Sequence, residues 1–137
     1  MKTIYTLIFA SLFSFAALAQ DGAKGPTDPT QASFSKFDHK IHNFGIVEYA
    51  GDGTCKFNFS NTGKEPLIIK NVKTSCGCTT PNYSKEPVQP NGEGFVTAKY
   101  DTKRVGGFQK TLTVIFMDDS QVSLTIKGNV KPQPTNV

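Results

Sequence analysis

Apolar residues fall on every second position in several short segments of this chain, and this period of two constrains the fold more than any other feature. In residues 121–128, Val122, Leu124 and Ile126 alternate with polar neighbours. Successive side chains of a β-strand point to opposite faces of its sheet, so such alternation predicts a strand with one buried face. The same alternation is found at residues 44–46, 55–60, 95–100 and 111–116.

One further apolar segment, residues 67–72, does not keep a single phase. Leu67 and Ile69 share one face of the predicted strand, whereas Val72 falls on the other. An extra residue in one strand, a β-bulge, restores the pattern in such a case. The sequence therefore predicts a bulge near Asn71.

Residues typical of tight turns separate these segments. Glycine, asparagine, aspartate and proline favour chain reversal, and they gather at residues 61–64, 90–92, 106–107 and 117–120. No stretch beyond the first 20 residues has a helical period. Short strands with frequent turns predict an all-β fold, an immunoglobulin-like β-sandwich of about seven antiparallel strands with Greek-key connections, over residues 34–131.

The first residues are typical of an export signal. Lys2 gives the positive charge, an apolar run extends from Ile4 to Leu18, and a small residue follows at Ala19. This three-part pattern predicts a signal peptide over residues 1–19, cleaved before Gln20. The run is too short for a membrane span, which needs about 20 apolar residues. We therefore expect a periplasmic or secreted protein with no membrane span in the mature chain.

Polar segments flank the predicted domain. Residues 20–33 contain glycines, prolines and polar residues with few apolar ones, which is typical of a flexible tether. Residues 132–137 are similarly polar and form the predicted C-terminal tail.

The charge of the chain is mildly basic and scattered. There are 15 Lys and Arg against 11 Asp and Glu, a formal net charge of +4. The basic residues occur singly along the chain, whereas a nucleic-acid or membrane surface needs clusters of them. The sequence therefore predicts no nucleic-acid partner.

Cys76 and Cys78, separated only by Gly77, are the most distinctive chemical motif, at the end of the strand predicted near residues 67–74. They form a candidate disulfide, thiol or metal site. In an extended strand their Cα atoms would lie about 6.6 Å apart, near the limit for a disulfide. A positive φ at Gly77 would bring them closer, and the small ring would be easily reduced. Two thiolates can alternatively chelate Cu(I), and buried sulfurs can simply pack the core.

Cys55 is the third cysteine, and an odd number leaves at least one sulfur outside any internal disulfide. It lies in phase with Phe57 and Phe59, so we expect a core thiol. A bridge from Cys55 to Cys76 or Cys78 stays open, because spacing does not decide the pairing.

No other residues form a catalytic or metal-binding motif. His39 and His42 are the only histidines, and on one strand they would face opposite sides, which does not suit joint metal chelation. Nucleophile-elbow, zincin and phosphate-loop patterns are absent from the sequence. We therefore expect no catalytic residues, and no cofactor unless Cu(I) binds the two neighbouring thiols.

Several of these segments together resemble a known family. Phe-Gly-Ile-Val at 44–47, Phe-Asn-Phe-Ser-Asn-Thr-Gly at 57–63, Ser-Cys-Gly-Cys-Thr at 75–79 and Ile-Lys-Gly-Asn-Val at 126–130 are similar to the exported bacterial family called domain of unknown function 1573. That family is common in Bacteroidetes and resembles the Hydin type of immunoglobulin-like domain. The resemblance implies the fold and the compartment but no activity.

Two hypotheses about function follow. The first is an exported, non-enzymatic module that binds a protein or cell-envelope partner through its faces and loops. The alternative is a thiol-based activity, either redox exchange or Cu(I) binding, at Cys76 and Cys78.

Overall fold

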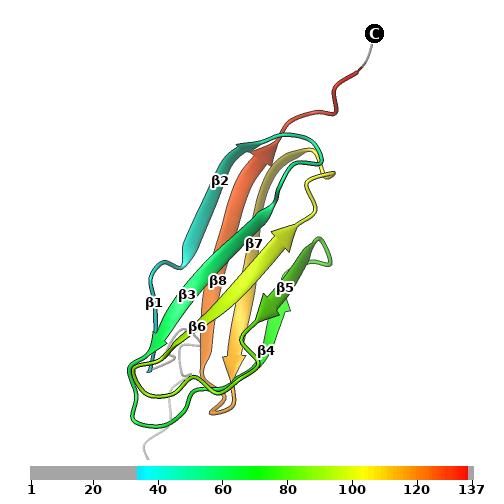
Figure 1. Cartoon of the computed structure of the whole chain (residues 1–137). Helices are drawn as coiled ribbons and strands as arrows, with labels where there is room; N and C mark the ends of the chain where they lie inside the picture. Colours follow the sequence, from blue (N-terminus) through cyan, green and yellow to red (C-terminus); the bar gives the residue numbers. More distant parts are fainter. Residues whose placement is uncertain (1–33, 136–137) are drawn as a thin grey trace, which may run out of the picture.

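The computed structural model describes residues 34–135, and every regular element in this range is a β-strand (Figure 1). No helix in this range is long and apolar enough to cross a membrane. The strands are β1 (Ser35–Phe37), β2 (Ile41–Val47), β3 (Thr54–Asn61), β4 (Ile69–Thr74), β5 (Thr79–Tyr83), β6 (Glu93–Tyr100), β7 (Gly106–Phe116) and β8 (Gln121–Val130).

The strands form two four-stranded sheets, in the orders β1-β3-β6-β5 and β2-β8-β7-β4. Figure 1 shows the two sheets lying face to face along the length of the molecule. Every connection crosses from one sheet to the other except β5–β6 and β7–β8. This arrangement confirms the predicted all-β sandwich.

The core lies between the sheets and is built from the alternating residues. Phe57 and Phe59 of β3 are buried against residues of the opposite sheet, and the rings of Phe59 and Phe116 meet edge to face with centroids 5.8 Å apart. Leu112 and Leu124 are fully buried on β7 and β8. Burying each such side chain stabilises the fold by about 1.5–3 kcal/mol, so the alternating pattern holds the sheets together.

Two local predictions are confirmed. The register of β4 against β7 shifts between Ile69 and Asn71, which is the predicted bulge. Residues 117–120 form the tight hairpin between β7 and β8, in which Asp119 takes a positive φ of 61° and its N–H donates to the Phe116 carbonyl at 3.0 Å.

The strand count and one pairing differ from expectation. There are eight strands rather than about seven: the six segments located in the sequence correspond to six of them, and β1 and β5 are additional. β1 has three residues, too few to show a period, and β5 contains Pro81 and little apolar alternation. In addition, β2 pairs with β8 in parallel rather than antiparallel fashion. The predicted signal peptide and tether lie outside the described residues.

Candidate functional site

Cys76 and Cys78 lie in the short connection between β4 and β5, where the chain crosses from one sheet to the other. The two strands lie side by side at one edge of the sandwich (Figure 1). The two cysteines are joined to each other by a disulfide, with their Cα atoms 5.3 Å apart. Of the pairings left open by the sequence, the structure therefore has the one between neighbours. We call residues 75–79 the cysteine corner.

The backbone of the corner differs from the sequence-based picture. β4 ends at Thr74, so the cysteines lie in a turn and not on an extended strand. Gly77 does not take a positive φ; among the described glycines only Gly45 and Gly106 do. The chain brings the sulfurs together through a turn of ordinary φ, and the hydroxyl of Thr74 stabilises it by donating to the Cys76 carbonyl at 2.8 Å.

The two sulfurs of the bridge differ in their surroundings. Cys78 is 5% exposed and belongs to the hydrophobic core, whereas Cys76 is half-buried at its margin. The N–H of Cys78 donates to the Cys76 sulfur at 3.3 Å. The hydroxyl of Thr79 lies 3.9 Å from the Cys78 sulfur. Each sulfur thus has a hydrogen-bond donor within reach, but only Cys76 lies near solvent.

Cys55 is separated from this corner. It lies on β3, is 5% exposed, and pairs in register with Ala98 of β6, which in turn pairs with Pro81 of β5. Burial raises the pKa of the Cys55 thiol to about 11, so the thiol stays protonated at physiological pH. The structure places Cys55 in the core as a free thiol.

His39 and His42 lie close together in the structure. The strand geometry considered for the pair does not apply, because His39 lies in the β1–β2 connection and only His42 is on a strand. Their ring centroids are 6.1 Å apart, and both rings are near Phe57. Burial, and then repulsion from His39, lower the pKa of His42. Within residues 34–135, no group of three or more metal-ligating side chains is found.

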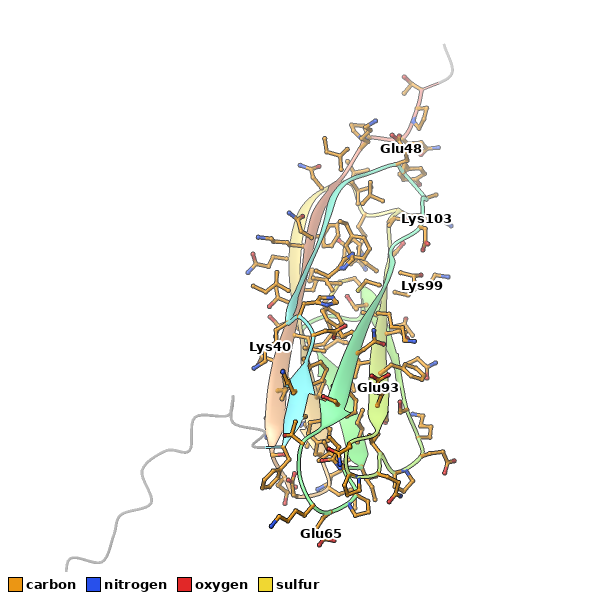
Figure 2. The ribbon with its side chains drawn as sticks, turned by 60° about the vertical axis from the view of Figure 1, so that its left-hand side comes forward. Lys40, Glu48, Glu65, Glu93, Lys99 and Lys103 are labelled. Carbon is orange, nitrogen blue, oxygen red and sulfur yellow. A yellow bond between two sulfur atoms is a disulfide. The ribbon has the colours of Figure 1, made fainter. Side chains whose placement is uncertain are left out.

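An apolar pocket of about 480 Å³ lies at one end of the sandwich, and the sequence analysis missed it. It is formed where the β3–β4 connection meets the β7–β8 hairpin and the residue before β1. Its apolar walls come from Phe34, Pro66, Leu67, Ile68 and Met117, and Lys64, Glu65 and Asp118 stand among its polar lining residues. Figure 2 shows Glu65 at the tip of the molecule opposite Glu48. We call this site the end pocket.

Asn61 positions the loop that lines the end pocket. Its side chain is buried, and its amide N–H₂ donates to the carbonyls of Glu65 at 2.7 Å and Val88 at 2.9 Å. Its side-chain oxygen accepts from the N–H of Gly63 at 2.9 Å. All three bonds fix loop backbone, so the shape of the pocket depends on this one side chain.

The open edges of both sheets are poorly suited to adding a strand from another protein. β5 contains Pro81, which has no N–H to donate, and β1 is only three residues long. β4 has exposed Lys70 and Lys73 beside its bulge. The register of β2 shifts next to Gly45, which has a positive φ. Bulges, prolines and lysines of this kind discourage edge-to-edge pairing.

Solved structures share this fold. A protein of unknown function from Porphyromonas gingivalis W83 matches with a TM-score of 0.62 at 14% identity, over 70% of this chain and 46% of that chain. The ASH / PapD-like domain of human CEP192 (PapD-like domain 7) matches with a TM-score of 0.61 at 8% identity, over 98% of this chain and 99% of that chain. The Vibrio cholerae VesB protease matches with a TM-score of 0.57 at 14% identity, over 71% of this chain and 32% of that chain.

At these identities the likeness shows the fold alone, an immunoglobulin-like β-sandwich. The match covers less than half the length of the Porphyromonas and Vibrio proteins. No curated protein matches this chain. A family model described as protein of unknown function (DUF1573) matches residues 35–130, which run from β1 to the end of β8. The chain therefore belongs to the DUF1573 family, the one that its motifs resemble.

Proposed function

We propose that this chain is an exported module that binds a protein of the cell envelope through the end pocket, a contact that involves no catalysis. The observation that supports the proposal is the pocket itself, whose volume of about 480 Å³ lies within the range of roughly 300–1,000 Å³ typical of ligand sites. Large apolar side chains remain open to solvent beside it, with Met117 59% exposed. Exposed apolar surface around a pocket is typical of a site that binds a ligand or another protein.

The lining of the pocket favours a polypeptide partner. Its apolar walls fit the apolar side chain of another protein, and Lys64, Glu65 and Asp118 provide groups for hydrogen bonds around it. An apolar centre with a polar rim is typical of protein interfaces. The protected edges of the sheets make strand addition a poor alternative, which leaves the end pocket as the better-suited contact.

A pair of matched variants tests this proposal. Met117 and Val105 are exposed apolar residues at opposite ends of β7, 59% and 53% exposed, and only Met117 lines the pocket. We expect Met117→Asp to abolish capture of a partner from a detergent extract of the cell envelope, because it places a charge in the apolar site. Val105→Asp should capture the partner as the unmodified chain does.

Two outcomes would contradict the proposal. One is that no protein is captured above background by the unmodified chain. The other is that Met117→Asp captures the same proteins in the same amounts. Thermal unfolding of both variants checks that each is folded before capture.

The export part of the proposal rests on the pattern in residues 1–19. We expect the protein recovered from the periplasm or the medium to have an intact mass that begins at Gln20. Recovery of the uncut chain from the cytosol would contradict export without bearing on the pocket.

A further inference from the structure

We propose that Cys76 and Cys78 form a reversible redox pair, which accepts electrons from the dithiol of a partner by thiol–disulfide exchange at Cys76. This activity is separate from the end pocket, which lies at the other end of β4. The inference rests on the unequal exposure of the two sulfurs, the donors beside them and the way in which the corner is held.

The unequal exposure selects the sulfur that is attacked. Exchange needs a thiolate to approach one sulfur in line with the disulfide bond, so access decides the site of attack. Cys76 is half-buried at the margin of the core, whereas Cys78 is 5% exposed. An incoming thiolate therefore reaches Cys76, and Cys78 is the leaving group.

The neighbouring donors favour the reduced pair. A hydrogen bond to a thiolate stabilises its charged form. The Cys78 N–H already donates to the Cys76 sulfur at 3.3 Å, and the Thr79 hydroxyl lies 3.9 Å from the Cys78 sulfur. Because a stabilised thiolate leaves more readily, the Thr79 contact favours departure of Cys78 when the bridge opens, and the Cys78 N–H favours the later release of Cys76 from the mixed disulfide.

The corner is held by bonds that do not involve the bridge. The N–H of Ser75 donates to the Thr111 carbonyl at 2.9 Å, and the N–H of Thr111 donates to the Ser75 hydroxyl at 3.1 Å. On the other side, the N–H of Asp101 donates to the Cys78 carbonyl at 2.9 Å. The backbone on each side thus stays attached to β7 and to the end of β6 when the bridge opens, so the pair can cycle without unfolding the domain.

Cys55 takes no part in the exchange. It lies on β3, and β6 lies between β3 and β5, since Cys55 pairs with Ala98 and Ala98 pairs with Pro81. Burial also keeps the Cys55 thiol protonated. The two-electron chemistry is therefore confined to the neighbouring pair.

The exchange proceeds in two balanced steps. A thiolate of the partner attacks the Cys76 sulfur and forms a mixed disulfide, while the bond between Cys76 and Cys78 breaks and its electron pair goes to the Cys78 sulfur, which takes up a proton. The second thiolate of the partner then attacks the partner's own sulfur in the mixed disulfide. This releases the Cys76 thiolate, which is protonated, and leaves the partner oxidised to a disulfide. Two electrons and two protons pass from the partner to the pair.

The first test opens the bridge in the folded protein. We use Cys55→Ser as the background, so that only the pair contributes thiols, and dithiothreitol as the dithiol probe. After alkylation with N-ethylmaleimide, intact mass should show two labels without any denaturant, while circular dichroism stays that of the folded protein. A bridge that opens only in denaturant would overturn the proposal.

The second test compares the two sulfurs. In the same background, Cys78→Ser leaves only Cys76, and Cys76→Ser leaves only Cys78. With oxidised glutathione as the probe, we expect the Cys76 thiol to form the mixed disulfide at least about tenfold faster, because reactivity follows exposure and thiolate character. Equal rates, or a faster reaction at Cys78, would overturn the proposal. Thermal unfolding of the two variants checks that both compare folded chains.

Discussion

Asn61 provides the sharpest test of how the end pocket is built. Asn61→Ala removes three side-chain hydrogen bonds: a buried one to the Val88 carbonyl, and two part-buried ones, to the Glu65 carbonyl and from the Gly63 N–H. At a net value of about 1 kcal/mol each, their loss lowers the free energy of unfolding by about 3 kcal/mol. The backbone bonds of Asn61 with Gly92 and Asn91 remain, so the strand itself should persist. Equilibrium urea unfolding measures the change.

Asn58 supplies the matched control, because it has the same side chain on the same strand. It is exposed, and its one side-chain bond, to Asp38, is 3.3 Å long. Asn58→Ala should therefore change the free energy of unfolding by no more than about 0.5 kcal/mol. If Asn61→Ala costs less than about 1 kcal/mol, or no more than Asn58→Ala, then the buried amide does not hold the loop as argued.

Three further predictions concern the cysteines and a histidine. Reduction of the Cys76–Cys78 bridge should lower the free energy of unfolding by about 2 kcal/mol or less, because a bridge at a sequence separation of 2 removes little chain entropy from the unfolded state. Unfolding in urea with and without dithiothreitol measures this change, and a larger loss refutes the prediction. The Cys55 thiol, with its pKa raised to about 11 by burial, should resist iodoacetamide in the folded protein at pH 8 and react in urea; labelling without urea would contradict this. Because the pKa of His42 is lowered from its ordinary 6.5, the unfolded chain binds the proton more tightly, so stability is full above about pH 6.5 and falls as the pH drops below it. Unfolding in urea at pH 8 and pH 5 should show this loss reduced in His42→Gln, and an equal loss in both proteins would refute it.

The sequence predicts the strands that bury a face, and it does so for a physical reason. The buried residues of β3, β7 and β8 keep a single phase because one side of each strand lies in the core, and the phase slip in β4 marks a real bulge. β1 has only three residues, and β5 contains Pro81 and little apolar alternation, so no period reveals them. Alternation also carries no information on the partner of a strand, and the parallel pairing of β2 with β8 could not be predicted from it.

The candidate sites were predictable to different degrees. The two neighbouring cysteines, Cys76 and Cys78, are evident from the sequence. Which two of the three cysteines form the disulfide, however, depends on where Cys55 lies in the fold. The end pocket has no local signature, because its walls come from residues that are far apart in the chain. Phe34 lies just before β1, and Met117 lies just after β7. A large apolar residue next to a turn, such as Met117 before Asp118, is the one hint that the sequence offers.

The pairing of β2 with β8 has a consequence for the order in which this molecule can assemble. β8 is the only neighbour of β2 in its sheet, and Ile41 pairs with Thr125 near the far end of the chain. A growing polypeptide has therefore synthesised β2 long before its hydrogen-bonding neighbour exists. Because contacts so distant in sequence form slowly, we expect the pairing of β2 with β8 to form late, once β8 has been made.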